Sequence, residues 1–236
     1  MLKFPVENRA ASAAAAGGHE IKNVFITGGT GYMGRNLIVA LRERGHEVRA
    51  LVRPGSEGKL PPGCPLVFGN ALEATSYASQ VPPADTFVQL VGYPKPDPRK
   101  AQQFRDVDLK SGLAGLAAAK QAGVQHFIYV SVAHPAPIMQ VYIQPRIEVE
   151  EAIRASGLNA TILRPWYVLG PDHRWPYLLL PAYWIMALIP GKRETARRLG
   201  LVTLAQMINA LTEAVEHPGQ GLRIVEVPEI RRLRQK

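Results

Sequence analysis

The sequence predicts an α/β fold built on a doubly wound parallel sheet, and three observations support this prediction. The first is a glycine-rich turn at 27–31, between an apolar run and a segment of helical periodicity. The second is the alternation of short apolar runs with helical segments along most of the chain. The third is the almost wholly apolar run HFIYVSV at 126–132, which is typical of a strand covered on both faces by helices.

The glycine-rich turn joins a predicted strand at 24–26 to a predicted helix past residue 34. Glycines at intervals of three allow a tight turn, close approach of the backbone to a pyrophosphate, and close packing of the helix on the strand. The helix N-terminus adds free N–H groups and the positive end of the helix dipole. A second predicted strand at 47–52 completes the unit, which therefore predicts a dinucleotide site. The residues expected to line it at this turn are Gly28, Thr30, Gly31, Tyr32, Met33, Gly34 and Arg35.

The remaining elements continue the alternation of strands and helices. Strands are expected at 66–68, 85–91, 126–132, 160–163 and 222–227, and helices at about 102–121, 146–155 and 203–216. Ligands of a doubly wound sheet bind at the carboxyl ends of the strands, so these ends should meet around the site. The residues expected there are Arg53, Asn70, Leu90, Val91, Gly92, Tyr93, Ser131, Arg164, Pro165 and Trp166.

Length and composition suit one sizeable domain. The chain has 236 residues, 47% of them hydrophobic, and we expect a single domain over 21–236 preceded by a flexible alanine-rich extension. That extension does not resemble a secretory signal. Lysines and arginines exceed acidic residues, 28 against 19, for a net charge of +9. They are scattered apart from a cluster at 231–236, so a solvated basic surface is expected and nucleic-acid binding is not.

Cysteine usage and hydropathy limit the remaining classes. Cys64 is the single cysteine, so neither an internal disulfide nor a cysteine metal cluster is expected, and a cytoplasmic location fits. No apolar run reaches the length of about 18–20 residues that a membrane-spanning helix needs. The segment 171–200 nevertheless contains a strongly apolar stretch at 177–190. This stretch is interpreted as a lid over a lipophilic substrate, a subunit interface or a peripheral membrane contact, the alternative being a core helix.

Taken together, these motifs resemble the short-chain dehydrogenase/reductase superfamily in its atypical and extended branches. The motifs that carry the resemblance are TGGTGYMGRNL at 27–37, LVR at 51–53, GVQHFIYVSV at 123–132, Tyr142 with Arg146 four residues later, and ILRPWYVLGP at 162–171. The resemblance implies a Rossmann fold with NAD(P) bound across the strand ends. It is specific for the superfamily and not for a substrate.

The residue after the second strand distinguishes the two forms of this cofactor. An NAD site usually places a carboxylate there for the ribose 2′-hydroxyl, whereas this chain has Arg53 and no acid before Glu57. A guanidinium suits a phosphate better than a bare hydroxyl. In the similar isoflavone-reductase-like group this arginine acts with a basic residue after the last glycine, which here is Arg35. NADP is therefore expected rather than NAD, the alternative being that Arg53 is a solvated turn residue.

The resemblance also implies a catalytic set. In catalytic members a Tyr acts as general acid/base, a Lys four residues later lowers its pKa and holds the ribose, and a Ser orients the substrate oxygen. Ser131 and Tyr142 match, but Arg146 replaces the Lys. Arginine keeps the charge but cannot relay a proton. Pro145 also disfavours an early helix start, so Tyr142 and Arg146 need not share a face, and Tyr142 is alternatively only a wall residue.

Other polar residues near the strand ends are weaker candidates. His134 is a candidate acid/base, Tyr93 and Lys95 are candidate pocket residues, and His173 with Arg174 are candidates for an anionic substrate group. No His/Asp/Glu grouping has the spacing of a metal site.

The predicted function is therefore an NADP-dependent oxidoreductase acting on a small carbonyl or alcohol, or an epimerase or dehydratase that uses the same nicotinamide. The alternative is a non-catalytic NADP-binding protein, such as a redox sensor, a regulator of the nitrogen-metabolite-repressor kind or an assembly subunit. Arg146 in the Lys position and the apolar stretch 177–190 both fit that alternative.

Overall fold

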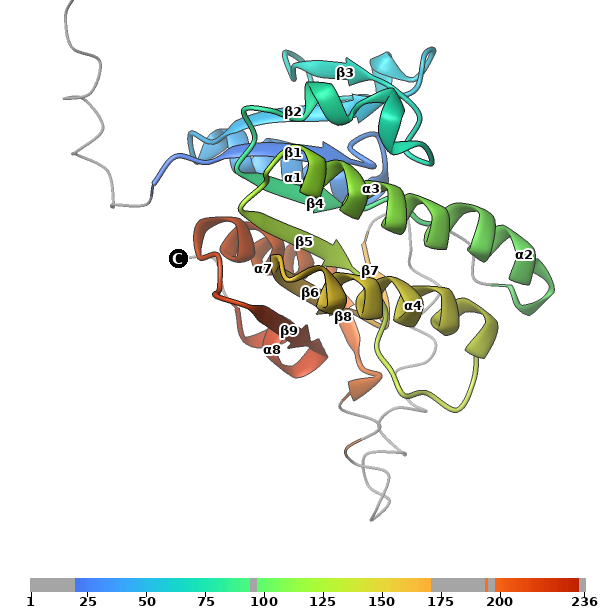
Figure 1. Cartoon of the computed structure of the whole chain (residues 1–236). Helices are drawn as coiled ribbons and strands as arrows, with labels where there is room; N and C mark the ends of the chain where they lie inside the picture. The colour runs from blue at the N-terminus through green and yellow to red at the C-terminus, as the bar shows by residue number, and fades with distance from the viewer. Residues whose placement is uncertain (1–19, 94–96, 171–193, 195–197, 234–236) are drawn as a thin grey trace, which may run out of the picture.

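The structure is a computed structural model that describes residues 20–93, 97–170, 194 and 198–233. A parallel sheet of seven strands in the order β3-β2-β1-β4-β5-β6-β9 crosses the molecule (Figure 1). The strands are β1 (Asn23–Thr27), β2 (Glu47–Val52), β3 (Leu66–Phe68), β4 (Thr86–Gln89), β5 (His126–Val130), β6 (Asn159–Arg164) and β9 (Leu222–Glu226). The strand order reverses between β1 and β4, which is the doubly wound topology that the sequence predicts.

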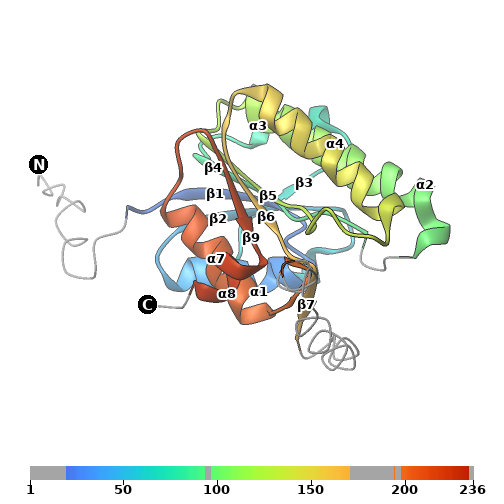
Figure 2. The same cartoon turned by 90° about the horizontal axis from the view of Figure 1, so that it is seen from below.

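Helices cover both faces of this sheet, as Figure 2 shows. One face carries α1 (Tyr32–Glu43), α7 (Leu204–Glu216) and α8 (Val227–Arg232), and the other carries α2 (Ala101–Phe104), α3 (Lys110–Gln121) and α4 (Gln140–Ser156). Successive side chains of β1 point to opposite faces of the sheet, so they belong to two different core clusters. Val24 and Ile26 pack with the first group of helices, and Phe25 packs with the second.

Three aromatic rings lie in the core on the face of the sheet that carries α2, α3 and α4. Phe25, Phe87 and Phe127 occupy paired positions on β1, β4 and β5, and successive ring centroids lie 5.4 Å apart. Each such pair contributes roughly 0.5–1.5 kcal/mol beyond the apolar area that it buries. These ring contacts therefore add to the packing of the middle of the sheet, next to the strand ends.

Strands β4 and β5 end earlier than their apolar runs predict. Their pairing stops at Gln89 and Tyr129. Beyond that point Leu90 donates to the carbonyl of Thr27 on β1, whereas Ser131 donates to Leu163 on β6. The segments that follow β4 and β5 therefore separate at the carboxyl edge of the sheet. This is the edge at which a doubly wound fold binds its ligand.

Helix α4 begins at Gln140 rather than near residue 146. Pro145 lies in its second turn, where it removes the hydrogen bond to the Val141 carbonyl. The first turn forms nevertheless, because Tyr142 and Ile143 donate to the Met139 carbonyl at 2.9 and 3.0 Å. The prediction failed because it treated the proline as a start signal when the helix accommodates it one turn later.

The helical stretch expected at 102–121 contains a feature that periodicity does not reveal. Between α2 and α3 the chain forms a π-helical segment, η7 (Arg105–Leu109). Such segments occur frequently at functional sites because the extra residue turns a side chain out of the regular helical row. Here it contains Asp108, whose side chain is buried.

Three elements near the C-terminus were not expected, while one prediction was confirmed. Strands β7 (Tyr167–Leu169) and β8 (Leu201–Thr203) form a small parallel sheet, and α8 follows β9 directly. Thr203 caps α7 as predicted, because its side chain accepts from the Gln206 N–H at 3.2 Å in a capping box. Short 3₁₀ turns cover Glu57–Lys59, Ala74–Ser76, Ala78–Gln80 and Pro98–Lys100. In the part of the chain that the structure describes, no helix is long and apolar enough to cross a membrane.

Candidate functional site

The glycine-rich turn between β1 and α1 is packed too closely for side chains. Gly28 has φ +78°, and a Cβ there would lie 2.9 Å from the Leu90 carbonyl carbon and the Val91 nitrogen. A Cβ on Gly34 would overlap the Gly28 carbonyl oxygen. These contacts fix the turn against the chain that follows β4, so two of the predicted glycines have the structural reason expected of them.

The N-terminus of α1 is prepared for an anion. Its N-cap is Gly31, no side chain caps it, and its first turn contains no acidic residue. The first N–H groups of a helix lack intrahelical acceptors, and the helix dipole favours negative charge beside them. A diphosphate would satisfy these groups, so the turn fits the cofactor that the fold implies.

Two arginines near this turn have no carboxylate partner among the described residues. Arg53 directly follows β2, and Arg35 lies in the second turn of α1; both side chains are exposed. Among the described residues neither guanidinium forms an ion pair. Glu57, the nearest acid after Arg53, instead accepts a hydrogen bond from the Gly55 N–H at 3.0 Å. Two guanidinium groups therefore remain available for an anionic group.

Asn70 and the segment after β6 complete the surroundings of the turn. The Asn70 side chain accepts from the Leu72 N–H at 3.1 Å, so it shapes the turn after β3. Tyr32 presses its hydroxyl against Gly170, where any Cβ would collide with it. Met33 and Trp166 are partly buried against the same core cluster. The segment that follows β6 therefore lies against the start of α1, as the convergence of strand ends predicts.

Ser131 is hydrogen-bonded to a buried network that includes Glu150 of α4. Its hydroxyl donates to Glu150, which also accepts from Arg164 and lies 3.3 Å from His134 Nε2. Burial raises the pKa of Glu150, but hydrogen bonds from His134, Arg164 and Ser131 outweigh it and lower the pKa to about 2. Glu150 is therefore ionised at neutral pH, and the proton of Ser131 points at it.

Tyr142 and Arg146 do share one face of α4. The guanidinium carbon of Arg146 lies 3.8 Å from the centroid of the Tyr142 ring, in a cation–π contact. The same guanidinium donates to the Tyr142 carbonyl and forms an ion pair with Asp108 on η7. Burial raises the pKa of Tyr142, while Arg146 acts in the opposite direction. The charge expected to activate the phenol is thus shared with a buried carboxylate.

A row of aromatic rings links Tyr142 to the loop after β4. Phe104 packs edge-to-face on Tyr142 with centroids 5.1 Å apart, and on Tyr93 with centroids 5.9 Å apart. The Tyr93 hydroxyl accepts from the Lys100 amino group at 2.9 Å. Gly92 lies against this cluster, because a Cβ on it would come 2.9 Å from Asp108 Oδ1. The loop that should border the substrate is therefore held by polar and aromatic contacts.

Two buried acidic residues, Asp108 and Glu150, were missed by the sequence analysis. Tyr142, Arg146 and Glu150 are spaced by four residues, so they fall on one helical face, and this spacing was the available signal. Asp108 gave no comparable signal because its placement depends on the π-helical segment. Lys95, His173, Arg174 and the stretch 177–190 lie outside the described residues. In the described ranges no cluster of His, Cys, Asp and Glu could hold a metal ion.

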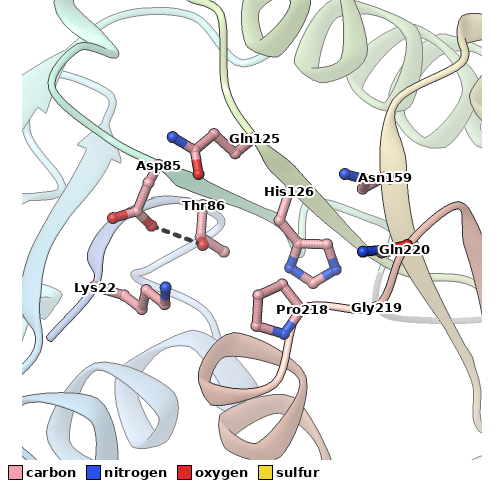
Figure 3. Close-up of a pocket in the computed structure, with 9 residues that line it drawn as sticks. All are labelled: Lys22, Asp85, Thr86, Gln125, His126, Asn159, Pro218, Gly219 and Gln220. Atoms are coloured by element: carbon pink, nitrogen blue, oxygen red, sulfur yellow. Dashed lines mark hydrogen bonds between the residues drawn. The ribbon is translucent and has the colours of Figure 1, made fainter. Parts of the chain in front are cut away.

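A hollow at the opposite edge of the sheet contains none of the predicted site residues (Figure 3). Thr86, His126 and Asn159, the first residues of β4, β5 and β6, contribute to its lining. His126 bonds Thr161 through Nε2 at 3.0 Å, and burial lowers its pKa to about 4. Because this is the amino edge of the sheet, the hollow is separate from the site around the glycine-rich turn.

Comparison with known proteins agrees with this geometry. The chain is 27% identical over 211 residues to a ceramide reductase of Caulobacter vibrioides, covering 89% of this chain and 65% of that protein. It is 27% identical over 145 residues to the photosystem II assembly factor Ycf39 of Cyanophora paradoxa, covering 60% of this chain and 44% of that protein. The chain thus spans less than two thirds of the length of either relative.

Among solved structures, the Bordetella bronchiseptica enzyme WbmH in complex with NAD⁺ has a similar fold. The TM-score is 0.65 at 22% identity, over 86% of this chain and 75% of that one. These matches confirm the doubly wound fold and the resemblance to the extended short-chain dehydrogenases/reductases. The NmrA-like family matches residues 20–170, which is more than half of the chain. The chain belongs to the NmrA-like family.

Proposed function

We propose that this protein is an NADP-dependent oxidoreductase that reduces a carbonyl group of a small molecule. The observation that carries the proposal is the pair of exposed arginines, Arg35 and Arg53, beside a helix N-terminus that has no cap of its own. Backbone N–H groups of α1 would bind the diphosphate, and the two guanidinium groups would bind the 2′-phosphate. The reductase among the relatives supports the class of reaction.

The residues around Tyr142 suit proton donation. When bound, the nicotinamide supplies the hydride. Tyr142 supplies the proton to the substrate oxygen, and the surrounding protein, which raises its pKa, keeps the phenol protonated at neutral pH. Ser131 already donates its proton to Glu150. Its oxygen is then an acceptor, which positions the hydroxyl of the alcohol product.

The test is a calorimetric titration with NADPH and NADH, followed by turnover assays. We expect tighter binding of NADPH and its oxidation with at least one member of a panel of ketones, quinones and aldehydes. Tyr142→Phe should bind NADPH unchanged and lose turnover by about 10²–10⁴-fold, the usual contribution of a general acid. Binding of neither dinucleotide would refute the proposal, and undiminished turnover would remove Tyr142 from the mechanism.

A second function, NADP binding without catalysis, is favoured by one specific observation. Arg146 is engaged with Asp108 and the Tyr142 ring, so its charge is not free to hold a ribose. An assembly factor among the relatives is consistent with such a role. This reading expects NADPH binding without turnover on any panel member, and no gain on Arg146→Lys.

A further inference from the structure

Among the described residues, the ion pair between Asp108 and Arg146 is the most deeply buried pair of opposite charges beside a predicted site residue. The two side chains are 2% and 6% exposed, and they join η7 to α4. Arg146 lies on the face of the Tyr142 ring, 3.8 Å from its centroid. A carboxylate, a guanidinium and a phenol therefore share one poorly solvated location, where each charge acts strongly on its neighbours.

Asp108 reaches this location because of the π-helical segment. Its carboxylate accepts from the Tyr93 N–H, at 3.1 and 3.2 Å to its two oxygens, and from Arg146. Asp106, two residues earlier on the same segment, points to solvent and pairs with Lys110 at 3.0 Å. One segment thus carries a buried acid and an exposed acid, of which only the buried one faces the site.

Four ionisable groups interact with Tyr142, and they come from four different elements. They are Arg146 on α4, Asp108 on η7, Tyr129 on β5 and Tyr167 on β7. Arg146 favours the phenolate and Asp108 disfavours it, whereas the other two are neutral phenols at ordinary pH. The protonation of Tyr142 therefore depends on how far Asp108 neutralises Arg146.

We propose that Asp108 is a positioning residue that neutralises Arg146 and thereby keeps Tyr142 protonated. This inference rests on the proposed function for its biological meaning, because only a proton donor needs to be held in that form. It also gives a role to the arginine at position 146. The guanidinium is stacked on the ring and paired with a carboxylate, so it does not convert the phenol into phenolate at neutral pH.

The test is a near-ultraviolet titration of phenolate absorbance in the cofactor-free protein. The signal of Tyr142 is isolated by subtracting the titration of the same background carrying Tyr142→Phe. Asp108→Asn keeps the shape and one acceptor oxygen but removes the charge. We expect it to shift the Tyr142 midpoint to lower pH, and Arg146→Gln to shift it to higher pH. Asp106→Asn, which removes the same charge on the solvent side, should leave it unchanged.

The outcomes separate this inference from the proposed function. An unmoved midpoint in folded Asp108→Asn, or an equal shift in Asp106→Asn, would overturn the inference. If Asp108→Asn does not fold, the double variant Asp108→Asn/Arg146→Gln decides, because it leaves neither member of the pair as an unpaired buried charge. A midpoint close to that of the wild type supports the inference, since two charges that cancel are removed together, and a midpoint well above it overturns the inference. The titration needs neither cofactor nor turnover. A wild-type protein that binds no NADPH would therefore refute the proposed function, while the titration would still test the role of Asp108.

Discussion

The arginines on the two sides of the candidate site differ in burial and in pairing. At the glycine-rich turn, Arg35 and Arg53 are exposed and have no carboxylate partner among the described residues. On α4 and β6, Arg146 and Arg164 are buried and each is paired with a buried carboxylate. The arginines of the first side leave their charge exposed to solvent, whereas those of the second side are paired with carboxylates inside the protein.

This difference suggests separate roles for the arginines: the exposed ones suit ligand binding, and the buried ones stabilise the fold. Exposed guanidinium groups cost little to maintain in water, so they can be reserved for a phosphate. Buried ones must be paired within the fold, because an uncompensated buried charge is strongly destabilising. Substitutions on the buried side should therefore affect stability, and substitutions on the exposed side should affect binding.

The largest expected effect is that of Glu150→Ala. It leaves Arg164, whose side chain is 10% exposed, without its main carboxylate. We expect a loss of about 3–5 kcal/mol in the free energy of unfolding, measured by urea denaturation. Glu151→Ala, at an exposed position on the same helix, should change it by less than about 0.5 kcal/mol. Equal effects of the two substitutions would contradict the assignment of Glu150 to a buried network.

The pH dependence of stability is a second test of the buried side of the site. The folded-state pKa of Glu150 is about 2, below its unfolded value of 4.5. The stabilisation is therefore fully present above the unfolded pKa and is lost as the pH falls from about 5 to 2, roughly 3 kcal/mol in all. Denaturation series at several pH values should show this loss in the wild type and a flatter profile in Glu150→Gln. The same slope in both proteins would exclude Glu150 as its source.

A smaller effect is expected on the exposed side, from Gly34→Ala. The added Cβ overlaps the Gly28 carbonyl, so the turn must open and move its N–H groups. NADPH affinity should fall at least tenfold, about 1.4 kcal/mol, as measured by calorimetry. Gly58→Ala, whose Cβ would meet nothing within 4 Å, is the matched control and should bind as the wild type does. Retained affinity in Gly34→Ala would place the dinucleotide elsewhere.

The glycine-rich turn, Tyr142 and Arg146 could be located from the sequence, whereas the buried acids Asp108 and Glu150 could not. Gly28, Gly34 and Arg53 act through local spacing, since turn, strand end and helix start follow one another along the chain. The pairing of Arg146 could not be predicted, because its partner Asp108 lies 38 residues away and is turned inward by a π-helical segment. The start of α4 was misplaced for a similar reason. Pro145 was judged by local rules, although the first helical turn had already formed before it.

The most direct test of the contrast is the ratio of NADPH to NADH affinity in the wild type and in Arg35→Ala/Arg53→Ala. Two charge-assisted contacts of at least about 1.5 kcal/mol each predict a loss of roughly 100-fold or more in NADPH affinity, with NADH affinity nearly unchanged. Arg42→Ala, at the far end of α1, should change neither, because its guanidinium bonds the Pro62 carbonyl. A wild type that binds both dinucleotides equally, or a double variant that weakens both alike, would contradict the account.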